Sequence, residues 1–266
     1  MAEFQVTDSI KAEKLIFMLK NINVLSSQIT IYFKKKGIYC QGMDLSQICL
    51  FEFEIDAEGE NKWLDNYKLE NDTETNIGIN SVILAKILNT YKKDQAVTFK
   101  VDAVKNDILN INFNFIDEKA NSIYDKEFQI PLIDINEEIL NIPFKEYAVD
   151  IEIQSKIFDK LCGEFALFDD MLKIKCSESK IEMTASGHEG KMKVRINVDD
   201  LDEFSIQEDL VYQDSYSLAY FNNMCIFHKL SDTMLLNFEN ERPMRLTYAI
   251  ADGFILKFYM GPKAKD

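Results

Sequence analysis

Residues that commonly carry catalysis or bind metals are scarce in this sequence of 266 residues and have no productive spacing. The two histidines, His188 and His228, are far apart, and the SGHEG context of His188 lacks the HExxH pattern of a zinc site. No GxGxxG or GxxxxGK(S/T) loop occurs among the nine glycines. No two of the five cysteines form a CxxC pair, which favours buried, reduced thiols: Cys40, Cys49, Cys162, Cys176 and Cys225. We therefore expect no enzyme, no metal site and no cofactor.

The basic residues offer a different chemistry, a loose attraction to phosphate. Of the 30 basic residues only Arg195, Arg242 and Arg245 are arginine, which leaves 27 lysines. Arginine reads guanine edges through paired hydrogen bonds, whereas lysine is a flexible, hydrated point charge. A lysine-dominated surface therefore suits phosphate contact without sequence recognition. The formal net charge of −15 argues against nucleic acid unless the two signs are segregated on the surface.

Apolar periodicity predicts an antiparallel α+β fold. Helices are indicated near 12–19 and 157–161 and over 79–93 and 217–230. Alternation predicts strands over 28–33, 37–43, 47–55, 96–101, 108–115, 171–176, 180–186, 191–198, 234–239 and 244–249. The strands run as meanders rather than as alternating strand–helix units, which is typical of antiparallel sheets.

The pattern repeats once along the chain. Ile29, Ile31 and Phe33 alternate as Leu172, Ile174 and Cys176 do, 143 residues later. This period is too long for a solenoid and indicates two copies of one domain. A segment bounded by Pro131 and Pro143 favours a connector over the alternative of an edge strand. We predict a first domain over 1–129, a connector over 130–147 and a second domain over 148–266.

Charge is unevenly divided between these elements. The predicted helices sum to +5, while 56–75 and 197–214 hold seven acids each. Each helix lysine alone is more simply a solvated helix face; facing a common hole, together they would form a positive channel in a negative body. The candidate DNA-binding residues are Lys11, Lys14, Lys20, Lys86, Lys92, Lys93, Lys156, Lys160 and Lys229.

Four ordered segments resemble the proliferating cell nuclear antigen family of sliding clamps. They are GIYCQGMDLSQICLFEF (37–53), LNIP (140–143), ASGHEGKMKV (185–194) and AIADGFILKFYMGPK (249–263). Family members carry close relatives of these segments in the same order. The resemblance implies a DNA-clamp fold, with two similar domains of antiparallel sheets and two helices each, assembling as a closed homotrimeric ring.

The family's function would then apply: a polymerase processivity factor that encircles double-stranded DNA and tethers replication and repair enzymes. DNA polymerase, a clamp loader and other proteins with clamp-binding peptides are the implied partners. The resemblance also implies a partner-peptide pocket, although each of its residues could instead be packed in the core. Its residues are Met43, Gln47, Ile48, Leu50, Leu140, Ile142, Pro143, Pro243, Tyr259, Gly261 and Pro262.

The sequence departs from the family in the second half, where Gly163, Ala219 and Ile226 occupy positions that are commonly basic. DNA contacts are therefore expected mainly from the first half, where Phe17 is an unexpected apolar residue on a DNA-facing helix. Ring closure is expected to pair edge strands around 123–130 and 183–190.

Three alternatives stay open: a clamp subunit of a checkpoint heterotrimer or a clamp-derived coactivator, an acidic DNA mimic, and a hydrolase. The sequence shows no signal peptide and no apolar run of about 18 residues, so a soluble intracellular protein without membrane contact is expected. It would work in the nucleus or, if viral, in a virus factory.

Overall fold

The chain divides into two compact units in the computed structural model, which describes residues 2–60, 62–101, 107–115, 124–135, 138–143 and 145–264. Unit 1 comprises residues 1–43, 52–139 and 250–255, and unit 2 comprises residues 44–51, 140–249 and 256–266. Two short segments, 44–51 and 250–255, are thus exchanged. Each unit draws on both halves of the sequence.

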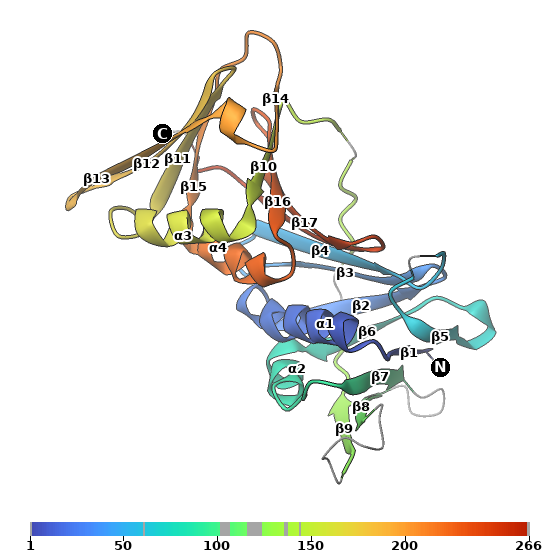
Figure 1. Cartoon of the computed structure of the whole chain (residues 1–266). Coiled ribbons are helices and arrows are strands. Elements are labelled where there is room, and N and C mark those ends of the chain that lie inside the picture. Colours follow the sequence, from blue (N-terminus) through green and yellow to red (C-terminus); the bar gives the residue numbers. More distant parts are fainter. Residues whose placement is uncertain are drawn as a thin grey trace. The chain divides into compact units, whose positions relative to one another are not determined.

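Unit 1 combines two helices with two antiparallel sheets (Figure 1). The strand orders are β5-β1-β7-β8-β9 and β4-β3-β2-β6. Residues 49–51 of β4 belong to unit 2. The elements in chain order are β1 (Ala2–Val6), α1 (Ser9–Asn21), η1 (Ile22–Val24), β2 (Gln28–Lys34), β3 (Gly37–Met43), β4 (Cys49–Asp56), β5 (Asp65–Leu69), η2 (Glu70–Asp72), β6 (Thr75–Asn80), α2 (Ser81–Leu88), β7 (Gln95–Val101), β8 (Ile108–Phe115) and β9 (Lys126–Pro131).

Unit 2 repeats this arrangement. Its sheets have the orders β14-β10-β16-β17-β18 and β13-β12-β11-β15. Its elements are β10 (Val149–Gln154), α3 (Ser155–Phe165), β11 (Met171–Ser177), β12 (Lys180–Gly187), β13 (Gly190–Asn197), η3 (Val198–Asp200), β14 (Glu203–Ile206), β15 (Tyr212–Ser217), α4 (Leu218–Cys225), η4 (Ile226–Lys229), β16 (Thr233–Phe238), β17 (Met244–Ala251) and β18 (Phe254–Met260).

The duplication predicted from the sequence is confirmed, strand for strand. Ile31 pairs with Cys40 between β2 and β3, and Ile174 pairs with Met183 between β11 and β12, both 143 residues later. The α+β class with two similar domains is likewise confirmed.

Local sequence explains why the helices form and how they pack. Asp8 caps α1 by accepting a hydrogen bond from the Lys11 N–H at 2.9 Å, and Asn80 caps α2 through the Ile83 N–H. The buried side of α1 includes Leu15, Ile16 and Leu19. Within unit 1 α1 packs against α2, and within unit 2 α3 packs against α4 (Figure 1).

Aromatic rings join the two sheets within each unit. In unit 1 the ring of Phe4 on β1 lies 4.8 Å from Phe99 and 6.2 Å from Phe33 on β2. In unit 2 Phe238 on β16 lies 5.3 Å from Tyr212 and 5.9 Å from Tyr216 on β15. Such aromatic pairs contribute about 0.5–1.5 kcal/mol beyond the area they bury, so they fix the two sheets against each other.

Two sequence-based expectations are wrong in detail. Helix α2 ends at Leu88 instead of residue 93, because Asn89 and Thr90 are poor helix formers and Asp94 has a positive φ of 68°. Strand β12, which covers most of the predicted edge at 183–190, is paired on both sides and offers no free edge; β13 ends that sheet instead. The predicted edge at 123–130 falls largely on β9, which does end its sheet, while residue 123 lies outside the described residues.

Candidate functional site

The candidate DNA-binding lysines of unit 1 belong to α1, α2 and the turn after α2. Lys11, Lys14 and Lys20 lie on α1 and Lys86 on α2, whereas Lys92 and Lys93 follow the helix because it ends early. Lys86, Lys92 and Lys93 are exposed and the three lysines of α1 are partly covered. The helix pair and the turn after α2 therefore carry six lysines.

Two of these lysines are held by backbone carbonyls. Lys11 Nζ donates to the carbonyl oxygen of Lys62 at 2.9 Å and lies 5.4 Å from the centre of the Trp63 ring. Lys14 Nζ donates to the carbonyl oxygen of Ile250 at 3.3 Å. Neither ammonium group forms an ion pair with a described residue, so both lysines still contribute to the positive potential, but each is less mobile than a free surface lysine.

Three more of the candidate lysines lie beside aromatic or acidic side chains. Lys20 Nζ lies 5.9 Å from the centre of the Phe17 ring, which explains why an apolar residue occupies this face of α1. Lys92 Nζ lies 5.7 Å from the Tyr124 ring, and Lys93 Nζ is 3.8 Å from a Glu13 carboxylate oxygen. Lys93 is thus partly neutralised, whereas Lys86 makes no ion pair with any described residue.

The helices of unit 2 carry less free positive charge. Lys156 and Lys160 lie on α3, where Lys160 Nζ is 3.6 Å from Glu164, and Lys229 ends η4. Gly163 and Ala219 are exposed, and Ile226 is half-buried, at the positions expected to be basic. The helices of unit 2 therefore present fewer lysines than those of unit 1.

Asp44 builds the loop that carries the first part of the candidate peptide pocket. Its Oδ1 accepts hydrogen bonds from the N–H groups of Ile48 at 2.8 Å and Cys49 at 2.6 Å. Its Oδ2 accepts from the Ser46 N–H at 2.9 Å and from the Tyr220 hydroxyl at 2.7 Å. Burial alone would raise the pKa of this carboxyl, but the hydrogen bonds led by that from Cys49 hold the pKa below its usual value.

Sequence reasoning missed both Asp44 and Tyr220 as site residues. Asp44 had a signal, because it follows Met43 directly in the MDLSQ segment. Tyr220 had no such signal, since it lies 176 residues from Asp44 in the chain. The loop leaves Leu45 98% exposed and Ile48 44% exposed. Gln47 has a positive φ of 57°, the conformation that turns the chain back toward β4.

Other predicted pocket residues in unit 2 lie on three segments. The Gly261 N–H donates to the carbonyl oxygen of Ile48 at 3.2 Å, which joins the C-terminal segment to the Asp44 loop. Leu140 is 50% exposed, whereas Leu50 is 8% exposed and belongs to the core. The remaining positions are exposed or half-buried: Gln47, Ile142, Pro143, Pro243, Tyr259 and Pro262. Met43, half-buried, ends β3 and belongs to unit 1.

The segment that contains Leu140, Ile142 and Pro143 is fixed at its C-terminal end. The Tyr147 ring lies 4.7 Å from the guanidinium carbon of Arg245 and 5.2 Å from that of Arg242. Arg245 Nε also donates to Asn237 Oδ1 at 2.9 Å, so the arginine itself is held in place. Two of the three arginines of the chain thus serve this one attachment.

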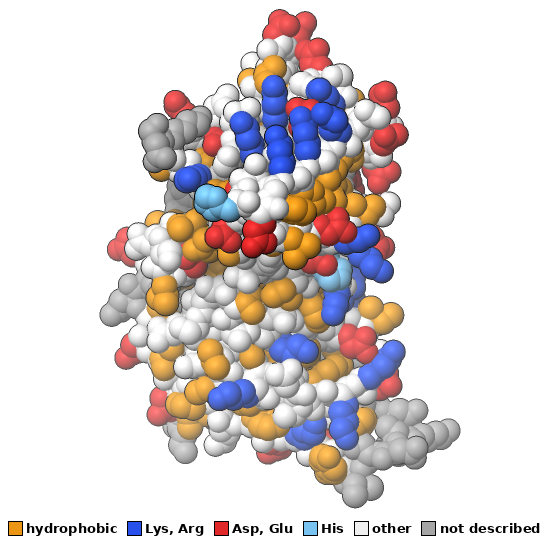
Figure 2. Space-filling model, turned by 90° about the vertical axis from the view of Figure 1, so that its left-hand side faces the viewer, with side chains coloured by type: hydrophobic (Ala, Val, Ile, Leu, Met, Phe, Trp, Pro, Cys, Tyr) orange, Lys and Arg blue, Asp and Glu red, His pale blue; other side chains and the backbone are white. Residues whose placement is uncertain are grey.

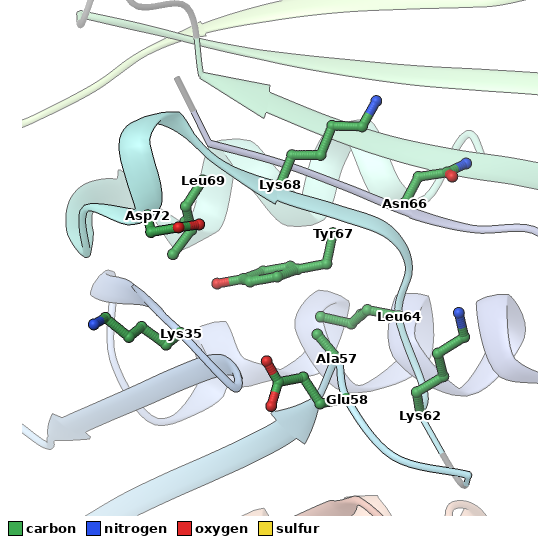
Figure 3. Close-up of a pocket in the computed structure, with 10 residues that line it drawn as sticks. All are labelled: Lys35, Ala57, Glu58, Lys62, Leu64, Asn66, Tyr67, Lys68, Leu69 and Asp72. Carbon is green, nitrogen blue, oxygen red and sulfur yellow. The ribbon is translucent and has the colours of Figure 1, made fainter.

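A cavity of about 680 Å³ lies in unit 1 beside β5 and the β2–β3 turn (Figure 3). Its lining includes Lys35, Lys62, Lys68 and the ring of Tyr67. Figure 3 shows the three lysine side chains spreading away from one another rather than converging on the cavity. The Tyr67 hydroxyl is occupied by the carbonyl oxygens of Lys34 and Gly37 at 2.7 and 2.9 Å. The cavity therefore lacks the convergent polar groups of a ligand site.

The thiol groups of the chain are buried. All five cysteines are free and buried, as expected, and burial raises the pKa of Cys49 and of Cys176 to about 12. In the part of the chain that the structure describes, His, Cys, Asp and Glu side chains do not gather in threes as a metal would need. None of the described helices has the length and apolar character needed to cross a membrane.

The duplicated unit, with paired antiparallel sheets and a packed pair of helices, defines the class of DNA-clamp folds. Family models for this class match both halves of the chain. Residues 1–139 match the N-terminal domain of proliferating cell nuclear antigen, and residues 141–263 match its C-terminal domain.

Curated relatives agree. The chain is 25% identical over 267 residues to proliferating cell nuclear antigen 2 of Drosophila melanogaster, covering 100% of this chain and 99% of the relative. It is 28% identical over 236 residues to proliferating cell nuclear antigen of Chaetomium thermophilum, covering 86% of each.

The chain belongs to the proliferating cell nuclear antigen family. It is a DNA sliding clamp, a processivity factor of DNA replication and repair, and the checkpoint-subunit and coactivator alternatives are not favoured. The family is not enzymatic, and it works with DNA and replication proteins at sites of replication and as trimers.

Proposed function

We propose that this clamp closes as a homotrimer around duplex DNA and tethers DNA polymerase and other enzymes to it without catalytic activity of its own. A closed ring cannot leave DNA sideways, so processivity needs no tight binding. Lysine contacts with phosphates are screened by salt and readily exchanged, which lets the ring slide. The supporting observation is the segregation of charge: six lysines gather on the α1–α2 pair and the turn after α2, in a chain whose net charge is −15.

The proposed DNA-contacting residues are the nine lysines named above, of which Lys20 and Lys86 are proposed as direct phosphate contacts in unit 1. Lys20 is oriented by Phe17 and Lys86 is exposed without a described ion-pair partner. Lys11 and Lys14 act mainly through their potential, because carbonyl oxygens already hold their ammonium groups. Unit 2 contributes fewer contacts, since its helix pair presents Gly163 and Ala219.

The proposed partner site is the set of eleven pocket residues, with Leu50 as part of its floor. Exposed Ile48 and Leu140 offer apolar surface, and Tyr259 offers an aromatic ring on a half-buried position. An apolar surface of this kind suits a short peptide that anchors through Leu, Ile or aromatic side chains. A clamp loader and polymerase with such peptides are the proposed partners, in the nucleus or a virus factory.

Ring closure is proposed to pair the edge strand β9 of one protomer with an edge of the next, with β13 replacing the region first expected. Both strands end their sheets within the described residues and so present unpaired backbone groups. We keep the domain limits 1–129 and 148–266, with the connector 130–147 between them, as part of the proposal.

The proposal is tested by topology. The protein is incubated at low salt with a linear duplex tethered to a bead by one end, so that a ring can thread over the free end. The free end is then blocked with streptavidin or left open. A clamp stays on the blocked duplex through a high-salt wash and is lost from the open one. The proposal would be contradicted if the protein were lost equally from the blocked and the open duplex, or if light scattering showed a monomer at all concentrations.

A further inference from the structure

One face of the sheet β13-β12-β11-β15 in unit 2 is strongly basic although the chain is acidic. The strand registers place Lys175, Glu182 and Arg195 in one row across the sheet, and Lys173, Thr184 and Lys193 in the next. The opposite face holds buried residues such as Ile174 and Met183. We call the six cations of the solvent side the basic face: Lys173, Lys175, Lys180, Lys191, Lys193 and Arg195.

A single carboxylate sits among these cations. Glu182 Oε1 lies 2.8 Å from Lys193 Nζ, 3.1 Å from Arg195 Nε and 3.5 Å from Lys180 Nζ. Hydrogen bonds from Lys193 and Arg195 lower the pKa of Glu182 to about 2, so the group is ionised at neutral pH. Lys173, Lys175 and Lys191 make no ion pair with any described residue. The face therefore keeps a large positive excess.

The basic face is compact and bordered by acids. Alternate residues of a strand are about 6.7 Å apart and neighbouring strands about 4.8 Å, so the cations, from the row of Lys191 to the row of Lys180, span roughly 20 Å by 10 Å. Figure 2 shows such a group of Lys and Arg side chains in its upper part, with acidic side chains around its margin. At one end Asp199 and Asp200 follow β13 directly, and Glu178 accepts a hydrogen bond from the Asp209 N–H at 3.0 Å.

These features favour a short acidic peptide over nucleic acid. The basic face carries no aromatic side chain on which the bases of a single strand could stack. A long duplex extends well beyond this face and would run over the acidic border, where its phosphates are repelled. A short extended segment rich in Asp or Glu fits within the face, and its alternate side chains repeat at the spacing of Lys191, Lys193 and Arg195.

We propose that the basic face of unit 2 binds an Asp- or Glu-rich segment of a partner protein, with Glu182 limiting the strength of binding. The site differs from the peptide pocket in residues and in chemistry, because it recognises charge and not apolar anchors. It also requires neither DNA nor ring closure, so it stands or falls independently of the proposed function.

The test uses the full-length protein without DNA and a fluorescein-labelled hexaglutamate, with hexaglutamine as the uncharged comparison. Binding is followed by fluorescence anisotropy at low salt. Lys173→Ala combined with Lys191→Ala should weaken hexaglutamate binding by roughly 3- to 10-fold, the loss expected from two partly exposed charge pairs. Lys86→Ala combined with Lys156→Ala removes two exposed helix lysines and should change it less than about twofold.

Glu182→Gln gives a second, opposite readout. Removing this carboxylate frees three cations, so hexaglutamate should bind at least about twofold more tightly. Such a gain cannot arise from misfolding. An equal loss in the helix-lysine variant, or no gain with Glu182→Gln, would overturn the proposal. A third outcome would also overturn it: a 24-bp duplex binds more tightly than the peptide and loses affinity in the Lys173/Lys191 variant. That result would assign the face to nucleic acid.

Discussion

Asp44 determines the shape of the loop at the candidate peptide pocket, since four hydrogen bonds converge on its carboxylate. Asp44→Asn removes the negative charge and replaces one acceptor oxygen with an amide donor. We expect a loss of about 1–3 kcal/mol in the free energy of unfolding, together with faster amide exchange of Ile48 and Cys49. Asp202→Asn, at an exposed aspartate of unit 2, is the matched control and should leave both quantities unchanged.

The same carboxylate predicts a pH dependence. The pKa of Asp44 is lower in the folded protein than its usual value of 3.8, so the unfolded chain takes up the proton first as pH falls. The contribution of Asp44 is therefore complete at neutral pH, and it declines below about pH 4 as the pH falls through the folded-state pKa. Stability curves of the wild type and Asp44→Asn should converge in acid; a constant gap would contradict this assignment.

Two glycines should respond in opposite ways to alanine. A Cβ at Gly261 meets no atom within 4 Å, so Gly261→Ala should stabilise unit 2 by about 0.4–1 kcal/mol through the unfolded state. Gly37 has φ +151°, and a Cβ there would lie 2.1 Å from the Ile55 carbonyl oxygen. Gly37→Ala should therefore lower the thermal midpoint clearly or prevent folding. A common sign for the two changes in calorimetry would show that these backbone environments are misassigned.

At the scale of elements, the Tyr147 end of the connector is attached through two aromatic–guanidinium contacts, of which that of Arg245 is the shorter. Arg245→Ala removes the group 4.7 Å from the Tyr147 ring and the hydrogen bond to Asn237. The expected loss is about 0.5–2 kcal/mol, with faster hydrogen exchange over residues 145–148. Arg195→Ala, on the sheet β13-β12-β11-β15, is the control and should leave exchange in 145–148 unchanged. Unchanged exchange in Arg245→Ala would mean that other contacts hold the segment.

Several strands found from the sequence have strong apolar alternation, although β1, β10 and β18 alternate as cleanly and were not predicted. Strands β2, β3, β11 and β12 were predicted to within a residue or two because apolar residues recur at every second position of each sequence. Strands β5 and β14 were missed, since neither buries a single residue and both are held by backbone pairing with a neighbour. Long-range pairing of this kind leaves no local pattern.

The residues of the candidate site also fall into those that the sequence could predict and those that it could not. Lysines on α1 could be assigned from helix periodicity, because charge and spacing are both local. The Asp44–Tyr220 hydrogen bond and the row Lys175, Glu182 and Arg195 could not, because they arise only when distant segments are brought into register. A resemblance to known clamps supplied the pocket residues, but burial of Leu50 shows that a matching position need not be a surface contact.

For the whole molecule, charge segregation matters more than net charge. A chain at −15 should be repelled by DNA at every surface except where lysines gather, and those gatherings are the α1–α2 pair and the basic face of unit 2. The first is proposed to meet DNA and the second an acidic peptide. Surface charges act over only about 8–10 Å at physiological salt, so each gathering attracts the ligand that lies directly against it.

Topological retention and electrostatic attraction should therefore be separable. Lys20→Ala combined with Lys86→Ala removes two proposed phosphate-binding side chains per protomer. In the bead assay, this variant should thread onto duplex DNA less readily. Its binding to the open-ended duplex should also depend less on salt: the slope of log binding constant against log salt concentration should decrease in magnitude by about 0.9 for each phosphate that is no longer neutralised. Once the free end is blocked, however, the ring should be retained as well as the wild type, because closure does not depend on these side chains. Lys68→Ala, an exposed lysine on β5, should change neither step. Loss of the double variant from blocked DNA would mean that the lysines hold the protein on DNA directly and that the ring does not.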